Sequence, residues 1–425
     1  MSEGPNAFCN GALREVRPVL FRPIGALAGG AGRLRPVEPS MPVRRLLGPL
    51  ALIVLVVAVG FAIVLSTREA GRQRAARAVV AVHGLVGSEK EAYLRDPRVL
   101  DELRKNGFDL RIETAGSREM AKRTDLSTYD FAFPAGAPAG QRLKVIVKAK
   151  DVYTPFFTPM AVASWKTIAN IMIANGIVKI DGGHYMIVDM PKLLAAENEG
   201  KRWHDFKASS GYDVNKSVLV TTTDPRKSNS GVMYAALASY VLNGNQVVQS
   251  DAQVQRVQTQ INGLFLRQGF QESSSAGPFE DYVEIGMGKA PLVMIYESQF
   301  IEYLLAHAND RGGQKVLLYP RPTIYTKHTF VPIDEAGDRL GQLLQTDPVL
   351  QHLAVEHGFR IQDSAYSSDF WKRNGISVPE QLIDVVDPPS FEFLEDLITG
   401  VERAYTSNQE VPRDGSNDSR PGRNS

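Results

Sequence analysis

The sequence predicts an α/β protein with largely parallel sheets, and three observations lead to this prediction. Short apolar runs typical of buried strands alternate with helical patterns from residue 78 to residue 404. Loops that contain glycine and serine join several strands to the helices that follow them. The length of 425 residues exceeds the usual size of a single core, so two or three structural units are expected.

Composition excludes some classes of function. Lys and Arg number 48 and Asp and Glu number 47, so a net charge of +1 provides no general attraction for nucleic acid. The single cysteine, Cys9, excludes a disulfide within the chain and a zinc site built from cysteines. We predict no cofactor and no nucleic-acid partner.

The first 45 residues are rich in Gly, Pro, Ala and Arg and have no sustained apolar period, so we predict that residues 1–45 are disordered. Met41 is followed by two arginines and then by an apolar run, as at the start of many exported proteins. We therefore interpret Met41, rather than Met1, as the true initiator.

An uncharged run of 20 residues extends from Leu46 to Leu65. At 1.5 Å per residue it is long enough to cross a bilayer core of about 30 Å. No cleavage motif follows closely, so we predict a signal anchor at residues 46–66 and a charged stalk at residues 67–77. Four arginines on each side leave the orientation undecided by charge. They are Arg33, Arg35, Arg44 and Arg45 before the run and Arg68, Arg72, Arg74 and Arg77 after it.

The first part of the body contains four predicted strands and four predicted helices. The strands are residues 78–82, 108–113, 129–133 and 143–148. The helices cover residues 89–94, 98–105, a segment from Arg118, and 166–175. Residues 83–88 (HGLVGS) are predicted to be a loop, and Asp96-Pro97 is a typical helix start.

The central stretch, residues 217–242, combines a predicted buried strand (217–222), a turn at Asp224-Pro225, a polar loop (226–231) and an apolar helix (232–242). Residues 228–231 would lie at the helix N-terminus, where free N–H groups hold anionic or carbonyl-bearing ligands. The alternative is an ordinary N-cap, since Ser, Asn and Asp are the preferred cap residues.

Later elements follow the same alternation. Strands are predicted at residues 291–296, 315–319 and 325–333. Helices are predicted at residues 251–267, 297–306, 336–344, 348–357 and 391–404, with an acidic segment at residues 279–288 and a disordered tail at residues 406–425.

Three polar loops carry Gly and Ser next to predicted strands: Gly87-Ser88, Gly116-Ser117 and residues 228–231. In parallel sheets, ligands bind beyond the carboxyl ends of the strands, on loops that open helices. If the chain folds as two lobes, these loops could face each other across a cleft.

The order of several motifs resembles that of bacterial extracellular solute-binding proteins. The motifs are VHGLVGSEKEAYLRDPRVLDELRKNGFDLRIETAGS, FAFPAG, PFFTPMAVASW, TTTDPRKSNSG, PLVMIYESQF, YPRPT and GFR. The resemblance is to the two-lobed type 2 periplasmic-binding fold, in the branch related to molybdate and phosphate binders. It implies a first lobe at residues 78–158, a second lobe at residues 159–300, and a return to the first lobe with the C-terminal helices at residues 301–405. It also implies hinge crossovers near residues 155–159 and 319–322.

The resemblance and the three loops together give a set of candidate ligand-binding residues. They are Gly87, Ser88, Gly116, Ser117, Ser228, Asn229, Ser230, Tyr296 and Glu297. Glu89 directly follows Ser88, and a carboxylate there would repel an anion if it pointed inward. We expect Glu89 to point to solvent, because a Glu at a helix N-terminus usually does.

The function implied by the resemblance is a membrane-anchored, extracytoplasmic binding protein. It would capture a small anionic or polar solute between two lobes for an ABC-type transporter permease or a sensor. One alternative is a scaffold that has lost its ligand and binds a membrane protein. A second is a hydrolase that uses Ser230 or the acidic residues Glu280, Asp281 and Glu284. The scattered histidines do not have metal-ligand spacing: His184, His204, His328, His352 and His357.

Overall fold

The computed structural model describes residues 79–182, 185–382 and 384–409. These residues all belong to one compact unit, Ala70–Ser425. The predictions for residues 1–45, 46–66 and 67–77, including the choice between Met1 and Met41, lie outside the described residues. Among the helices described, none is both long enough and apolar enough to span a bilayer.

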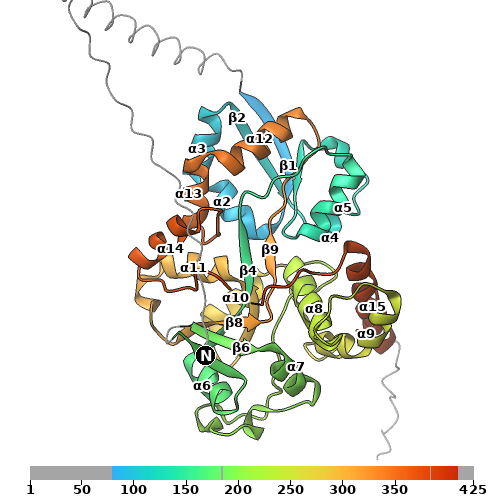
Figure 1. Cartoon of the computed structure of the whole chain (residues 1–425), viewed down its shortest axis with the longest axis vertical. Coiled ribbons are helices and arrows are strands. Elements are labelled where there is room, and N and C mark those ends of the chain that lie inside the picture. Colours follow the sequence, from blue (N-terminus) through green and yellow to red (C-terminus); the bar gives the residue numbers. More distant parts are fainter. Residues whose placement is uncertain (1–78, 183–184, 383, 410–425) are drawn as a thin grey trace, which may run out of the picture. The chain divides into compact units, whose positions relative to one another are not determined.

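The first sheet has the strand order β10-β3-β1-β2. Its strands β1 and β2 are labelled in Figure 1. Strands β1 (Val80–Val86), β2 (Phe108–Thr114) and β3 (Phe131–Phe133) run parallel. Strand β10 (Val331–Pro332) comes from much later in the chain and joins β3 antiparallel. The prediction of a parallel sheet is therefore confirmed for β1 to β3.

Side chains alternate across this sheet and bury both of its faces. Val82 and Val86 of β1 belong to one apolar cluster, whereas Leu85 belongs to another on the opposite face. The first cluster includes residues of α2 (Glu91–Arg95), α3 (Pro97–Lys105), α12 (Glu335–Thr346) and α13 (Pro348–Glu356). The second includes residues of α4 (Ser117–Met120) and α5 (Ala137–Val147). We call this sheet and these helices the first lobe.

Asp-Pro pairs start two of these helices, as the sequence predicts for α3. The Asp96 side chain accepts a hydrogen bond from Arg98 N at 2.8 Å, and Pro97 fills the first position of α3. Asp347 caps α13 in the same way, through Leu350 N at 2.9 Å. Each cap satisfies a backbone donor that has no partner inside its helix.

The second sheet has the order β5-β6-β8-β4-β7, with β9 also paired to β4. Its strands are β4 (Phe157–Trp165), β5 (Val178–Asp181), β6 (Tyr185–Asp189), β7 (Leu292–Tyr296), β8 (Lys315–Arg321) and β9 (Tyr325–Lys327). Strand β4 is antiparallel to β7, β8 and β9, and only β6 and β8 pair in parallel within the sheet. The prediction of largely parallel sheets is wrong for this half of the body.

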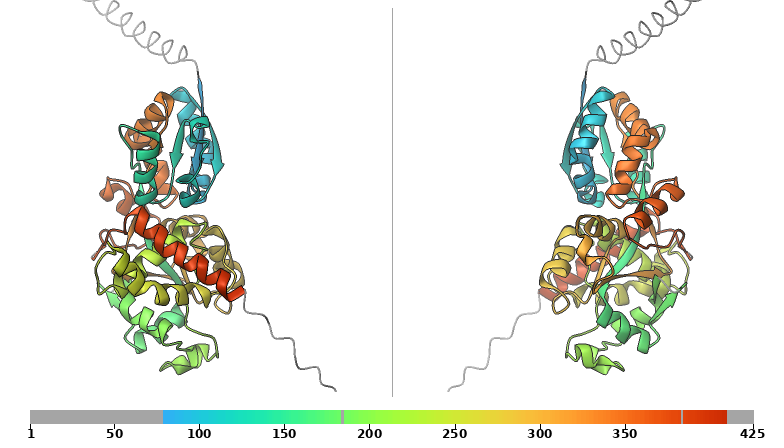
Figure 2. Two further views of the ribbon diagram at one scale, coloured as in Figure 1. Left: turned by 90° about the vertical axis from the view of Figure 1, so that its right-hand side faces the viewer. Right: turned by 90° about the vertical axis from the view of Figure 1, so that its left-hand side faces the viewer.

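Helices surround the second sheet, and we call these elements together the second lobe. They are α6 (Lys166–Ala174), α7 (Met190–Asn198), α8 (Asn229–Leu242), α9 (Asp251–Leu266), α10 (Ala276–Glu280) and α11 (Glu297–Ala306). Helix α8 is buried over most of its length, as its continuous apolar sequence indicates. The C-terminal helix α15 (Phe391–Gln409) packs along α9 and α8 (Figure 2). It includes residues 406–409, which were predicted to begin a disordered tail.

The chain crosses between the lobes at paired segments. Tyr153 and Phe330 exchange two backbone hydrogen bonds, of 2.9 and 2.8 Å, where the chain leaves the first lobe and where it returns. The first crossing is close to the predicted hinge at residues 155–159. The return lies after β9, whereas residues 319–322 are at the end of β8 inside the second lobe. Helix α14 (Ser364–Arg373) follows α13, and Val385 then bridges to Thr323 on the way to α15.

Several local predictions are wrong. Residues 83–86 continue β1 rather than forming a loop. Residues 143–147 belong to α5, not to a strand: Leu143 is fully buried while Val145 is 69% exposed, which follows the period of a helix. Residues 217–222 form isolated bridges rather than a regular strand, and residues 325–333 divide into β9 and β10. The sequence reasoning also missed β4, β5, β6, α7 and α14.

Candidate functional site

Two loops of the first lobe lie beyond the carboxyl ends of its parallel strands. Gly87 and Ser88 follow β1, and Gly116 and Ser117 follow β2. Gly87 N donates to Phe133 O at 3.2 Å, and Ser117 Oγ accepts from Ala135 N at 2.9 Å. Neighbouring strands therefore hold both loops in place at one edge of the sheet.

The loop of the second lobe leads into α8. Ser228 occupies the N-cap position, but its hydroxyl makes no capping hydrogen bond. The backbone N–H of Gly231 instead donates to Thr223 Oγ1 at 2.8 Å. The N–H groups of Asn229 and Ser230 form no hydrogen bond with any described residue. Ser228 is thus the N-cap residue by position but does not cap α8 through its side chain, and two donors remain at the positive end of the helix dipole.

These loops line one pocket of about 540 Å³. Six of the nine candidate residues are in its lining: Gly87, Ser88, Gly116, Ser117, Ser228 and Asn229. The other lining residues are Glu89, Thr114, Ala115, Glu119, Arg226, Lys227, Ser273 and Ser274. The structure thus brings together loops that are more than a hundred residues apart in the sequence. We call this cavity the serine pocket.

Direct contacts join the two lobes beside the serine pocket. Ser88 Oγ lies 3.2 Å from Ser274 Oγ, and Arg118 Nη1 donates to the backbone oxygen of Arg226 at 3.3 Å. A Cβ atom at Gly116 would lie only 2.1 Å from the backbone oxygen of Lys227. Glycine is therefore required at position 116 for the loops to approach this closely.

Cationic side chains of the second lobe border the serine pocket. Arg226 forms an ion pair with Asp224 at 2.7 Å, so much of its charge is already compensated. Lys227 is exposed and forms no ion pair within the described part of the chain. Glu119, on the first lobe, is 62% exposed and lies 3.8 Å from Arg123. The pocket therefore presents both signs of charge rather than a uniformly positive wall.

Glu89 does not point to solvent, contrary to the prediction. Its side chain is 6% exposed, and its Oε1 accepts a hydrogen bond from the fully buried Lys90. His328 Nδ1 lies 3.4 Å from the same oxygen. Burial opposes ionisation, but Lys90 and His328 together outweigh it and lower the pKa of Glu89 to about 2. Glu89 is therefore a carboxylate at neutral pH.

The other members of this buried cluster lie behind the pocket wall. The Lys90 ammonium is 4.8 Å from the centre of the Phe133 ring, and burial lowers its pKa against the opposing effect of Glu89. Burial, and then the charge of Lys90, lower the pKa of His328 to about 4, so its imidazole is neutral at pH 7. His328 Nε2 is buried and has no hydrogen-bond partner among the residues that the structure describes. We call Glu89, Lys90 and His328 the buried triad.

Three candidate residues are not in the lining of the serine pocket. Ser230 is fully buried, and its Oγ lies 2.7 Å from Thr223 Oγ1. The hydroxyl of Tyr296 accepts from Asn229 Nδ2 at 3.1 Å, so Tyr296 orients a lining residue from behind. Glu297 is fully buried and forms an ion pair with Arg360 at 2.6 Å. The contacts of these three residues are therefore structural, and none of the three lines the serine pocket.

Sequence reasoning missed Thr114, Glu119, Ser273 and Ser274. Ser273 and Ser274 belong to the run ESSSAG at residues 272–277, which precedes α10. The backbone oxygen of Glu272 accepts from Asp224 N at 2.9 Å, which fixes this run against the loop before α8. The three consecutive serines could have identified this run as a second polar loop of the second lobe.

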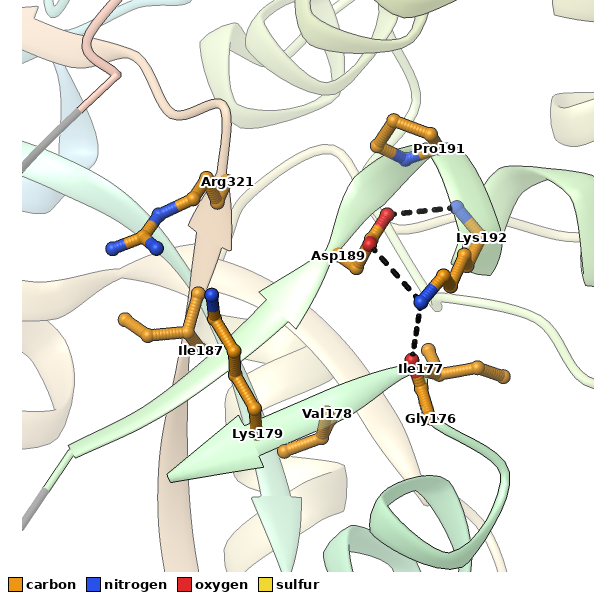
Figure 3. A pocket seen from close by; sticks show the side chains of 9 residues that line it. All are labelled: Gly176, Ile177, Val178, Lys179, Ile187, Asp189, Pro191, Lys192 and Arg321. Carbon is orange, nitrogen blue, oxygen red and sulfur yellow. Dashed lines mark hydrogen bonds and ion pairs between the residues drawn. The ribbon is translucent and has the colours of Figure 1, made fainter. Parts of the chain in front are cut away.

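A second cavity, of about 320 Å³, lies at the β5–β6 end of the second sheet (Figure 3). Lys192 Nζ donates to Gly176 O at 2.9 Å and lies 3.5 Å from Asp189, while Arg321 contacts Asp181 at 3.2 Å. Two of its three cations are thus already paired, and none of the predicted site residues lines it.

The histidines take separate structural positions. His357 lies between Asp96, at 3.0 Å, and Glu302, at 2.6 Å, and His352 stacks on Tyr366. His184 lies outside the described residues. No group of three or more His, Cys, Asp and Glu side chains in the described ranges is arranged to hold a metal ion.

Comparison with known proteins gives matches only among solved structures. No protein-family model matches the sequence, and no curated protein matches it. Similar structures include periplasmic solute-binding proteins. The sulfate-binding protein SubI from Mycobacterium tuberculosis is 16% identical, with a TM-score of 0.43 over 74% of this chain and 96% of that chain.

Two further structures show the range of these similarities. The molybdate-binding protein of Azotobacter vinelandii is 11% identical, with a TM-score of 0.39 over 66% of this chain and 100% of that one. The apo ferric ion-binding protein A of Pasteurella haemolytica is 12% identical, with a TM-score of 0.46 over 78% of this chain and 97% of that one.

Proposed function

We propose that this protein is a membrane-anchored, extracytoplasmic solute-binding protein. It captures a small anionic or polar solute in the serine pocket and presents it to an ABC-type permease or a sensor. The predicted span from Leu46 to Leu65 provides the anchor. The observation that carries this proposal is a single pocket lined by hydroxyl-bearing loops from both lobes.

The composition of the pocket suits reversible binding of a polar solute. Serine and threonine hydroxyls each donate one hydrogen bond and accept others, and the Asn229 N–H group adds a fixed donor. A solute that touches Ser88 and Ser228 at once would contact both lobes. Such a solute favours the closed arrangement, because its contacts are complete only when the loops approach each other.

The hydrolase alternative has less support. The hydroxyl partners of Ser230 are Thr223 at 2.7 Å and Ser228 at 3.2 Å, and neither can act as a general base at neutral pH. Of the acidic residues, Asp281 faces Lys289 at 3.7 Å. None of Glu280, Asp281 and Glu284 lines the serine pocket.

The scaffold alternative expects a cleft filled with large side chains. The lining instead consists mainly of glycine, serine, threonine and alanine, and it leaves about 540 Å³ open. This volume falls within the range of about 300–1,000 Å³ typical of small-molecule sites. The lining therefore favours solute binding over protein binding at this position.

A thermal-unfolding screen of the full chain in detergent tests the proposal. The solutes are inorganic oxyanions, sugars, sugar phosphates and amino acids at millimolar concentration. A solute at about 100 times its Kd adds about 2.7 kcal/mol to the free energy of unfolding, which corresponds to several degrees in Tm. If no solute raises Tm in the wild type, while a membrane-protein partner is still captured, the scaffold alternative replaces the proposal.

The extracytoplasmic location has its own test. Lys150 is exposed, so Lys150→Cys places a thiol on the surface of the body. A membrane-impermeant maleimide should label this variant in intact cells and leave the wild type, with only Cys9, unlabelled. Labelling of Lys150→Cys only after lysis would place the body in the cytoplasm and contradict the proposal.

A further inference from the structure

The serine pocket carries groups of opposite charge on its two walls. Hydroxyl groups line both of its walls, but its cation and its buried carboxylate come from different lobes. The free N–H group of Asn229 and the exposed Lys227 belong to the second lobe. The buried carboxylate of Glu89 belongs to the first lobe. A ligand that touches both walls meets chemically opposite groups.

Glu89 presents one free oxygen to the pocket. Lys90 and His328 both approach Oε1, whereas Oε2 forms no hydrogen bond with any described residue. The side chain is 6% exposed and lines the cavity, so this exposure is toward the pocket. Lys90 is fully buried and does not line the pocket. A solute beside Glu89 therefore meets a carboxylate acceptor and not the ammonium group that neutralises it.

The size of the pocket also argues against a single inorganic ion. The volume is about 540 Å³, whereas one water molecule occupies about 30 Å³ in the liquid. A small tetrahedral ion at α8 would leave most of the space, and the Glu89 oxygen, facing water. An ionised carboxylate in the same cavity would also repel a second anion next to it.

We propose that the solute is an organic molecule with two different groups. Its anionic group lies at the N-terminus of α8 beside Lys227, and its N–H or O–H donor lies against Glu89. This inference depends on the proposed function and specifies the ligand class. Amino acids, with an ammonium donor, and phosphorylated sugars, with hydroxyl donors, both have this chemistry.

Calorimetric titration of the full chain in detergent with matched probes tests this inference. Acetate carries only an anionic group, inorganic phosphate has its O–H donor on the anionic group itself, and glucose carries hydroxyl donors without an anionic group. Glucose 6-phosphate and glycine carry both, and they separate a hydroxyl donor from an ammonium donor. We expect at least one of these two to bind at least tenfold more tightly than phosphate, acetate and glucose.

The outcomes separate this inference from the proposed function. If inorganic phosphate, acetate or glucose binds as tightly as the two-group probes, the protein is a solute receptor but the ligand class is wrong. If none of the five probes binds, and the broader thermal screen is also negative, both proposals fail. If only the broader screen gives a ligand, that ligand must carry both groups, or the inference is wrong.

Two variants locate the groups of the solute. Glu89→Gln keeps the shape of the side chain and removes its charge, so the two-group probe should bind about 10- to 100-fold more weakly, with phosphate binding unchanged or tighter. Lys227→Ala should weaken the anionic probes about 2- to 5-fold and leave glucose unaffected. The exposed Lys150→Ala is the matched control and should change nothing.

Glu89→Gln leaves the buried Lys90 without its counterion, and the variant can fail to fold for that reason. The Lys227 variant and the matched probes with the wild type do not depend on it. Equal affinity of the folded Glu89→Gln variant and the wild type for the two-group probe would overturn the role of Glu89.

Discussion

Glu297 tests whether a fully buried candidate residue stabilises the fold or binds the solute. Sequence reasoning places it in the ligand site, whereas the structure buries it completely in an ion pair. Arg360 Nε donates to Oε2 at 2.6 Å, and Arg360 Nη2 donates to Oε1 at 2.8 Å. The Tyr319 hydroxyl also donates to Oε1, at 2.7 Å. Arg360 is only 6% exposed, so water cannot replace these contacts.

The substitution Glu297→Gln should lower the free energy of unfolding by about 3–5 kcal/mol. It removes the negative charge, and it leaves the Arg360 guanidinium buried beside a neutral amide that can accept at only one atom. The matched control is Glu356→Gln, which breaks the surface pair with Arg98, where the side chains are 33% and 55% exposed. That change should cost less than about 1 kcal/mol.

Urea unfolding of the full chain measures both changes, and solute titration of the folded variants measures affinity. We expect Glu297→Gln to shift the unfolding midpoint strongly and to leave the affinity unchanged. A stability loss similar to that of the Glu356 control, together with weaker solute binding, would refute the structural assignment and restore Glu297 to the ligand site.

Three further predictions concern other positions. Burial raises the pKa of the Glu197 carboxyl to about 8. Between pH 4.5 and 8 this carboxyl ionises in the unfolded chain but stays protonated in the folded chain, so the free energy of unfolding falls as the pH rises. Glu197→Gln should remove this loss, which is about 5 kcal/mol over the whole interval, and parallel pH profiles of unfolding for wild type and variant would contradict the prediction. Ser228→Ala should weaken solute binding several-fold in a titration. Ser230→Ala should mainly lower the free energy of unfolding in urea, by about 1 kcal/mol. The reverse pattern would exchange the roles of the two serines. Gly116→Ala should weaken solute binding at least tenfold in calorimetry, because the new Cβ would lie 2.1 Å from the Lys227 backbone oxygen and hold the two loops apart. Unchanged affinity would show that the close approach of these loops is not needed for binding.

The first lobe was largely predictable from local signals. Its parallel strands are separated by helices with clear caps, such as Asp96-Pro97 before α3. The second sheet was not predictable in this way. Val162 of β4 pairs with Met294 on one side and with Leu318 on the other. Strand partners so distant in the sequence leave no local trace of their direction.

The candidate site was predicted in part, for a similar reason. Loops with glycine and serine were the signal, and six of the predicted residues line the pocket, five of them glycine or serine. The same pattern cannot show which side chains turn inward, so it does not distinguish Ser228 from the buried Ser230. The sequence also cannot show that Glu89 turns toward Lys90 and His328, because His328 is more than two hundred residues away.

The most direct test of the central claim is the binding stoichiometry of the full chain, measured by calorimetry with the best solute from the screen. The wild type should bind one solute per chain in the serine pocket. Ser228→Trp places an indole ring between the two walls of that pocket, where the solute must contact both, and should abolish the binding heat while the chain stays folded. Undiminished binding by a folded Ser228→Trp variant would show that the solute binds elsewhere and would contradict the account.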